Sequence, residues 1–212
     1  MTNANTGANT GAITDLDTLD QLYAPVDPRS IVKVTDWVHP LYRRWIESSP
    51  FAVLSTVGPE GVDASPRGDG PGFVTVEDPH TLLLPDRRGN NRVDTLRNIV
   101  RDPRVALLFL VPGAGETLRV NGTGTVLVTP ALLDRFAVGG KPPRSVLSVA
   151  VQEVYFQCSR AVVRADLWNP ARHAPRGTLP TAGAVLAALS SGQHGGEDYD
   201  RTLPERVKAT LY

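Results

Sequence analysis

Residues 51–157 form a succession of short strand patterns joined by turns, and this feature limits the possible folds most strongly. The patterns, rich in β-branched and aromatic residues, cover 51–57, 62–66, 73–76, 81–84, 104–111, 116–128 and 146–157. The first four predict a meander or one wall of a barrel, because turns such as 58–61 join them closely. The whole stretch predicts a mainly β, α+β fold: an antiparallel barrel of six to seven strands with flanking helices, closed by its strands.

Two of the later strands carry more specific predictions. Residues 104–111 are nearly all apolar, which predicts a strand buried on both faces near the centre of the barrel. Polar and apolar residues alternate along 116–128, which predicts a half-buried strand with one polar face. Gly122 and Gly124 within it predict a bulge or bend, as the closure of a small barrel requires.

Apolar residues at three- and four-residue steps predict helices outside these strands. One amphipathic helix is expected from residue 36 to about residues 48–50, where Pro50 follows. A second covers 93–100 and is inserted directly after the fourth strand, and a short third follows Pro130. The helix at 93–100 matters most, because a basic loop leads into it.

The domain organisation is predicted from composition along the chain. Residues 1–12 are small and polar without periodicity, which predicts a disordered tail. Residues 13–180 carry the barrel domain. Residues 181–212 have apolar residues at helical spacing, which predicts a helical extension that packs on the barrel or on a partner subunit. A chain of 212 residues is long enough to bury one substantial core.

Charge and cysteine content exclude several classes of function. Lys+Arg and Asp+Glu number 22 each, so no global basic field favours nucleic acid or an anionic membrane. The single cysteine, Cys158, excludes an intrachain disulfide and a multi-cysteine zinc site, and we expect no metal. The apolar run 105–111 is far shorter than the ~20 residues of a membrane helix, and the N-terminus lacks the basic-then-apolar pattern of a signal peptide. These features predict a soluble, cytoplasmic protein.

The loop before the helix at 93–100 is the strongest candidate for a binding site. Arg87, Arg88 and Arg92 crowd the helix N-terminus, where the helix dipole disfavours cations by roughly 0.3–1 kcal/mol each. A bound anion would remove this conflict, because free backbone N–H groups, guanidinium groups and the amides of Asn90 and Asn91 can all donate hydrogen bonds to it. The loop therefore predicts a phosphate site.

Other residues of the loop refine this hypothesis. Asn91 is predicted to cap the helix, with Asp94 three residues later as the acidic partner of a capping-box-like start. Gly89 suits a close approach of the backbone to a ligand. The alternative interpretation is a solvated basic loop whose arginines pair with Asp86 and Asp94.

Three motifs follow one another in order along the chain. They are Ser65-Pro66-Arg67-Gly68-Asp69-Gly70-Pro71-Gly72-Phe73, then Leu84-Pro85-Asp86-Arg87 with Gly89-Asn90-Asn91-Arg92, and Glu116-Thr117-Leu118-Arg119-Val120-Asn121-Gly122. Together they resemble the pyridoxamine 5′-phosphate oxidase-like flavin proteins. The chain is most similar to a subgroup of probable FMN-dependent enzymes whose substrates are unassigned. The resemblance implies a split β-barrel homodimer with FMN in a cleft at the subunit interface.

The resemblance also implies a set of cofactor-binding residues. They are Ser65, Pro66, Arg67, Leu84, Pro85, Asp86, Arg87, Asn90, Asn91, Arg92, Arg119 and Trp168. Basic residues around the loop would hold the FMN phosphate, and the strand that ends at Arg67 would lie beside the isoalloxazine ring. Arg67 is the first candidate for a positive group near N1 and O2 of the ring, and Arg119 is the second. The alternatives are an Arg67–Asp69 surface pair and, for Trp168, a core residue instead of one that flanks the ring from the other subunit.

The implied function is an FMN-dependent oxidoreductase that transfers hydride through flavin N5 to or from a small molecule, with NAD(P)H as a candidate donor. No catalytic side chain is identified. Relatives often carry His where this chain has Gln157, which would remove any activity that depends on that His. The nearest counterpart of the vitamin B6 oxidases' terminal substrate-binding segment, 176–180, departs from theirs, so we do not expect B6 oxidation. The alternatives are a non-catalytic flavin carrier or a barrel that binds deazaflavin or haem.

Overall fold

The computed structural model describes residues 11–212, so the predicted disordered tail at 1–12 lies, except for its last two residues, outside the described part. The chain divides into two compact units, Met1–Val34 and Thr35–Tyr212. In the first, two short helices, α1 (Leu16–Asp20) and α2 (Pro28–Val32), begin at aspartates whose side chains accept backbone N–H groups. These caps account for helices so short that propensity alone would not hold them.

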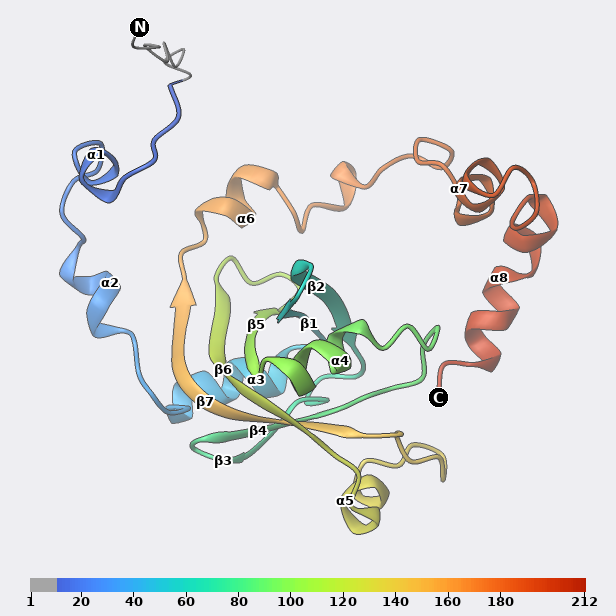
Figure 1. The fold of residues 1–212 in the computed structure, drawn as a ribbon, viewed down its shortest axis with the longest axis horizontal. Helices are drawn as coiled ribbons and strands as arrows, with labels where there is room; N and C mark the ends of the chain where they lie inside the picture. The colour runs from blue at the N-terminus through green and yellow to red at the C-terminus, as the bar shows by residue number, and fades with distance from the viewer. Residues whose placement is uncertain (1–10) are drawn as a thin grey trace, which may run out of the picture. The chain divides into compact units, whose positions relative to one another are not determined.

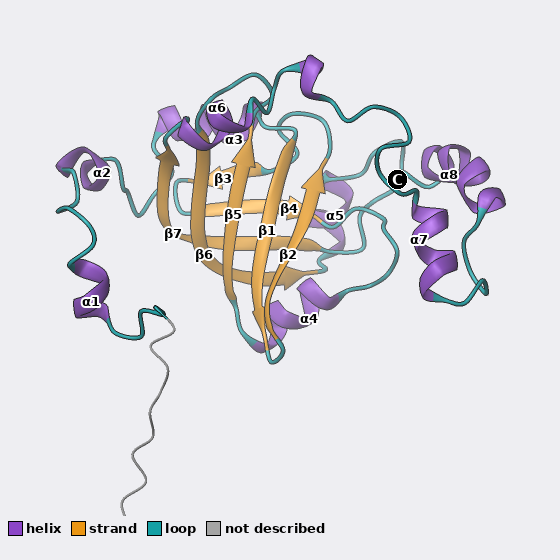
Figure 2. Cartoon of the chain, turned by 90° about the horizontal axis from the view of Figure 1, so that it is seen from above, coloured by secondary structure: helices purple, strands orange, loops and turns teal. Residues whose placement is uncertain are grey.

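The second unit contains a seven-stranded antiparallel sheet with flanking helices, and it is a split barrel of the α+β class (Figures 1 and 2). The strands are β1 (Phe51–Gly58), β2 (Gly61–Gly68), β3 (Thr75–Asp78), β4 (Thr81–Pro85), β5 (Arg104–Leu110), β6 (Thr117–Leu127) and β7 (Val146–Gln157). The helices are α3 (Pro40–Ser48), α4 (Asp94–Arg101), α5 (Pro130–Arg135), α6 (Arg160–Ala165), α7 (Ala182–Leu189) and α8 (Glu197–Ala209), with a 3₁₀ turn at Pro170–Arg172. The predicted fold class is confirmed.

The order of the strands corrects two predictions. The sheet runs β2-β1-β5-β6-β7-β4-β3, so the hairpins β1–β2 and β3–β4 lie at opposite ends and do not form a meander. The end strands β2 and β3 do not pair with each other, so the barrel is split, not closed by its strands. The long strand β7 causes this arrangement, because it pairs along its length with β6 and, through its first residues, with β4.

The two strand predictions for the middle of the sheet had different outcomes. In β5, Val105, Leu107 and Phe109 are buried, but the alternate residues are only half-buried, so the prediction of two buried faces was wrong for the single chain. The predicted bulge is confirmed, because the β6–β7 register shifts between Asn121 and Gly122. A Cβ at Gly122 would lie 2.1 Å from the Ala150 carbonyl oxygen, so this crossing requires glycine.

The helix α3 begins later than its predicted start at residue 36. Pro40 occupies the first helical turn, and the His39 side chain accepts the Leu41 backbone N–H at 3.2 Å. A proline at this position and a side-chain acceptor before it together define a helix start. The prediction from apolar periodicity therefore included residues 36–39, which are not helical in the structure.

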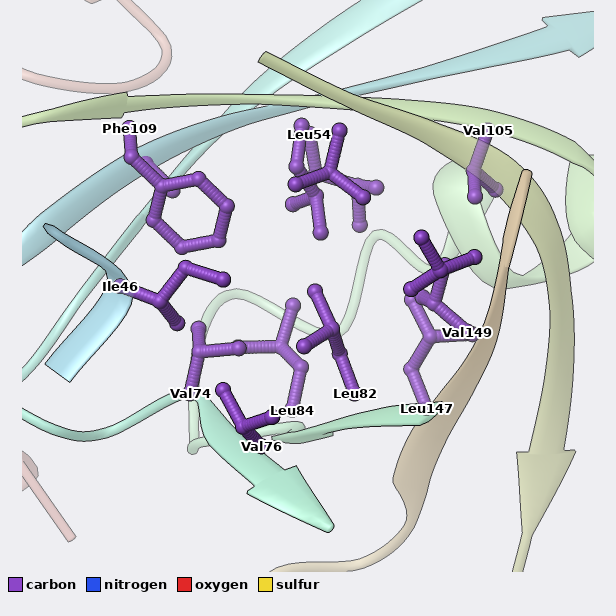
Figure 3. Close-up of a cluster of buried hydrophobic side chains, with 14 of the residues drawn as sticks. Ile46, Leu54, Val74, Val76, Leu82, Leu84, Val105, Phe109, Leu147 and Val149 are labelled. Carbon is purple, nitrogen blue, oxygen red and sulfur yellow. The ribbon is translucent and has the colours of Figure 1, made fainter. Parts of the chain in front are cut away.

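Apolar side chains fill the inside of the barrel. Figure 3 shows them pointing toward one another from the surrounding strands and α3; they include Ile46, Leu54, Val74, Val76, Leu82, Leu84, Val105, Phe109, Leu147 and Val149. A small barrel whose interior is occupied by its own side chains has no room there for a ligand. A binding site in this unit must therefore lie outside the core, at the split edge or on the outer face.

Candidate anion-binding cleft

A cleft of about 1060 Å³ lies beside the split in the barrel. Its walls come from five parts of the chain: β2 from Asp63 onward, Phe73 before β3, the loop from β4 into the start of α4, the loop between α5 and β7, and Tyr212 after α8. Figure 1 shows the end of the chain close to the loop that leads into α4. The predicted binding loop thus forms one wall of a real concave site.

The inward face of β2 is fastened to α4 at this cleft. The twofold alternation of a strand places Asp63, Ser65 and Arg67 on one face, and all three line the cleft. The Thr95 hydroxyl donates to Asp63 Oδ2 at 3.1 Å and lies 3.2 Å from Ser65 Oγ. This chain of hydroxyl groups ties an edge strand, which has a ladder partner on one side only, to the helix beneath it.

Two ion pairs cross the split between β2 and the loop after β4. Arg67 Nη1 lies 2.9 Å from Asp86 Oδ1, and Arg87 Nε lies 2.8 Å from Asp69 Oδ2. The sequence alternative of an Arg67–Asp69 pair is wrong, because each arginine binds the aspartate of the opposite segment. These side chains are only 11–22% exposed, so the pairs are better protected from water than ordinary surface pairs. They hold the split together where no ladder hydrogen bonds exist.

The pKa of Asp69 reflects this environment. Burial acts to raise the pKa of the Asp69 carboxyl, but hydrogen bonds from Tyr212, the Gly70 backbone and Arg87 outweigh it and leave the pKa below its ordinary value. The folded protein therefore favours the ionised form of Asp69 more than the unfolded chain does. The negative charge of this carboxylate holds Arg87 at the edge of the cleft.

This pKa predicts an acid dependence of stability. A carboxyl with a lowered folded pKa stabilises the fold above its unfolded pKa of about 3.9, and that contribution is lost as the pH falls through the folded value. The free energy of unfolding of the wild type, measured with urea, should therefore decrease as the pH falls below about 4. The free energy of unfolding of the Asp69→Asn variant should decrease less over the same interval. Identical pH slopes for the two proteins would show that Asp69 is not paired as described.

The start of α4 differs from the predicted capping box. The residue before the helix is Val93, and no side chain among residues 11–212 caps it. Asn91 has a left-handed backbone with φ of 61°, and its Oδ1 accepts from Arg144 Nη1 at 2.8 Å instead of capping the helix. Asp94 accepts from Arg92 Nε at 2.5 Å, which is one of the ion pairs of the alternative interpretation. The first backbone N–H groups of α4 are thus left without a side-chain acceptor at the cleft.

Positive charge exceeds negative charge in the cleft. The cationic residues are Arg67, Arg87, Arg88, Arg92, Lys141 and Arg144, and the carboxylates are Asp63, Asp86 and Asp94. The Nε of Arg67 is buried and has no hydrogen-bond partner within residues 11–212. A buried donor without an acceptor is costly, and an anionic ligand is one group that would satisfy it. The donor set of the cleft therefore suits an anion.

Most of the residues predicted to bind the cofactor come together here. Those that line the cleft are Ser65, Pro66, Arg67, Pro85, Asp86, Arg87, Asn90, Asn91 and Arg92. Leu84 does not line it, because its side chain is 3% exposed in the barrel core. Arg119 and Trp168 also lie elsewhere in this chain: Arg119 donates to the Tyr155 hydroxyl, and Trp168 donates to the Ala114 carbonyl.

Sequence reasoning missed Lys141, Arg144 and Tyr212, which also line the cleft. Lys141 and Arg144 flank two prolines, and this basic loop resembles any solvated loop until the fold brings it near Asn91. Nothing in the sequence around Tyr212 indicates a binding residue, because the only pattern there is the helical spacing of apolar residues in the extension before it. Their approach to the cleft depends on the path of the chain after β6 and after β7.

Residues 11–212 contain no group of three or more His, Cys, Asp or Glu side chains arranged to hold a metal ion. Within the same residues, no helix combines the length and the apolar character needed to cross a membrane.

The fold is that of a split-barrel protein with a basic cleft at the split, and a comparison with family models agrees with this fold. The profile of the pyridoxamine 5′-phosphate oxidase family matches residues 38–158. The chain belongs to this family. The match spans all seven strands and α4, and it ends before α6, so Tyr212 lies outside it.

Solved structures with a similar fold include three bacterial proteins. A candidate pyridoxamine 5′-phosphate oxidase from Lactobacillus delbrueckii is 21% identical, with a TM-score of 0.47, over 57% of this chain and 95% of that one. HupZ from Group A Streptococcus is 18% identical, with a TM-score of 0.43, over 55% and 91%. General stress protein 26 from Bacillus anthracis is 15% identical, with a TM-score of 0.42, over 53% and 88%. A comparison with curated proteins found no match.

Proposed function

We propose that the cleft binds FMN and that the protein is an FMN-dependent oxidoreductase acting on a small molecule. One observation carries the proposal: the uncapped start of α4 faces a cleft in which cationic side chains outnumber carboxylates two to one. Helix N-termini and guanidinium groups together are a usual site for a phosphate group. Family membership supports a flavin as the molecule that carries this phosphate.

The residues of the cleft divide into two groups by chemistry. Arg87, Arg88 and Arg144 offer donors near the start of α4 and would hold the phosphate group. The end of β2 offers Ser65 and Arg67, which would contact the ring. Bound FMN would supply a two-electron carrier at its N5. The chain would then bind and orient the cofactor. The ion pair with Asp86 would hold the Arg67 guanidinium group in position beside the ring.

Of the other cofactors considered, haem fits the cleft less well than a flavin. Haem needs an axial ligand such as His, Cys, Met or Tyr, and of these types only Tyr212 lines the described cleft. A deazaflavin shares the phosphate chemistry of FMN, so the cleft does not favour one over the other. The family supports FMN.

Titration of the purified protein with FMN, followed by quenching of flavin fluorescence, tests the proposal. Saturable binding with riboflavin bound more weakly is the expected result, because riboflavin lacks the phosphate. Bleaching of the bound flavin by NADH or NADPH would then distinguish an enzyme from a carrier. Absence of FMN binding would refute the proposal, and a deazaflavin or Soret absorption band in the protein as purified would replace it.

The outer face of the sheet supports a homodimer as part of this proposal. Ala106, Leu108 and Leu110 of β5 point to this face and are half-buried within the single chain. Within Thr35–Tyr212, Figure 2 shows no helix in front of the middle of the strands β2, β1, β5, β6 and β7 on this side. A row of apolar residues on an uncovered sheet face is typical of a protein interface.

We expect a C2 homodimer with two equivalent flavin sites, because a self-complementary interface generates a twofold axis. The interface should bury more than about 2,000 Å² in total. If each flavin contacts both chains, dilution that dissociates the dimer should also release FMN. Sedimentation at micromolar concentration with detection at the flavin absorbance measures both events. A monomer that retains FMN would contradict this expectation.

A further inference from the structure

Tyr212 reaches the cleft from a part of the chain that lies beyond the family match. Its hydroxyl donates to Asp69 Oδ1 at 2.6 Å, and its ring centroid lies 5.6 Å from Arg87 Cζ. The Nζ of Lys141 donates to its backbone carbonyl at 3.3 Å. Three separate loops therefore contact this single residue at the anion site.

The two helices before Tyr212 pack on each other. Asp200 of α8 accepts from the Thr181 hydroxyl and from the Gly183 backbone N–H, which is 2.8 Å away, so the start of α7 is anchored on α8. A Cβ at Gly183 would lie 2.4 Å from the Gly196 carbonyl oxygen, so the two segments are in close contact. The two helices therefore form one unit, and Tyr212, which follows α8, contacts the cleft.

Asp69 connects Tyr212 to Arg87. Its Oδ1 accepts from Tyr212 and from the Gly70 backbone N–H at 2.8 Å, and its Oδ2 accepts from Arg87 Nε. The carboxylate is thus held at both oxygens, and its orientation determines where Nε of Arg87 lies.

The guanidinium group of Arg87 is held on further sides. Its Nη1 donates to the Phe136 carbonyl at 2.7 Å, and the Tyr212 ring lies against it in a cation–π contact. Its Nη2 has no acceptor among the residues that the structure describes, although Arg87 lines the cleft. Two of the three nitrogens are therefore occupied by the protein, and the third is available to a ligand.

We propose that Tyr212 is a positioning residue of the anion site, which holds Arg87, directly and through Asp69, in the orientation that binds the phosphate group of the ligand. This inference rests on the proposed function and adds to it a residue outside the matched barrel. Without the Tyr212 hydroxyl, Asp69 keeps the Gly70 and Arg87 contacts but gains freedom to rotate. The Arg87 side chain then becomes less ordered in the free protein. Binding of the phosphate group must order it again, and the lost conformational entropy weakens the affinity.

The first experiment compares FMN with riboflavin, which differs from it by the phosphate. FMN affinity should fall roughly three- to tenfold in Tyr212→Phe, less than for a direct charged contact, and further in Tyr212→Ala, which also removes the ring. Riboflavin affinity should stay unchanged in both variants. Tyr199→Phe is the matched control, because Tyr199 lies on α8 and packs on Arg206, away from the cleft.

A double-mutant cycle then tests whether Tyr212 acts through Arg87. In an Arg87→Ala background, Tyr212→Phe should cause no additional loss of FMN affinity, because the group that it positions is absent. The same cycle with inorganic pyrophosphate, measured by thermal shift, tests the anion site independently of flavin. Circular dichroism confirms that each variant is folded.

The possible outcomes separate this inference from the proposed function. Failure of the wild type to bind FMN refutes the proposed function, and the pyrophosphate cycle still decides the role of Tyr212. Wild-type FMN affinity in a folded Tyr212→Phe variant overturns the inference alone. An equal loss for riboflavin, or the same loss in the Arg87→Ala background, would show that Tyr212 supports the fold and does not position Arg87.

Discussion

Arg87→Ala should weaken FMN binding by roughly ten- to a hundredfold, which corresponds to the loss of one charge-assisted contact of about 1.5–3 kcal/mol. The effect is expected to be large because Arg87 is only 20% exposed and is held by Asp69 and by the Phe136 carbonyl. An arginine that is already oriented loses little conformational entropy when it binds an anion. Fluorescence quenching of FMN measures the change.

Arg92→Ala provides the matched control for this experiment. The Arg92 side chain is 80% exposed and pairs with Asp94 at the surface, so its loss should weaken FMN binding only about two- to fivefold. Because Arg87→Ala leaves Asp69 without its cation, the double variant Asp69→Asn/Arg87→Ala should be measured with it. Wild-type affinity in folded Arg87→Ala, or an equal loss in Arg92→Ala, would remove Arg87 from the phosphate site.

Gly122→Ala should destabilise the fold by about 3 kcal/mol, since it adds a group where no space exists. The new Cβ would lie 2.1 Å from the carbonyl oxygen of Ala150 and 3.2 Å from Val149 Cγ1. The carbonyl belongs to the backbone of β7, so relief requires β6 and β7 to separate at the bulge. Urea unfolding measured by fluorescence gives the change in the free energy of unfolding.

Gly124→Ala is a matched test two residues along the same strand. Its Cβ would lie 2.9 Å from Leu147 Cδ1, the end of a flexible side chain, so a smaller loss is expected. Gly89→Ala should leave stability nearly unchanged, because no atom of the described residues lies within 4 Å of the added group. Equal costs at Gly122 and Gly124 would show that the backbone contact at the bulge does not limit the substitution.

Local patterns identified most elements of this fold. Alternation along 116–128 predicted the strand β6, and apolar residues at helical spacing predicted α4 and the helices α7 and α8. The conflict between basic residues and a helix N-terminus predicted the loop that forms one wall of the cleft. These features depend on residues within a few positions of one another, so the sequence expresses them directly.

Helix starts were less accurate, for a related physical reason. Asn is a residue type that often caps helices, but the Asn91 side chain accepts a hydrogen bond from Arg144, a residue of a distant loop. The helix α3 begins at Pro40 and not at residue 36, because the His39 side chain accepts the Leu41 backbone N–H there. A side chain with several available partners takes the one that the tertiary structure offers, and local composition does not decide between them.

The sequence by itself determined the family, the strand and helix types and the basic loop before α4, because each follows from short-range periodicity or an ordered motif. Only the tertiary structure decided that β2 and β3 leave the barrel split and that Arg67 and Arg87 cross it to Asp86 and Asp69. It alone brought Tyr212 to Asp69 across 143 residues. Such contacts depend on the path of the whole chain, and a hydroxyl or carboxylate carries no local mark of its distant partner.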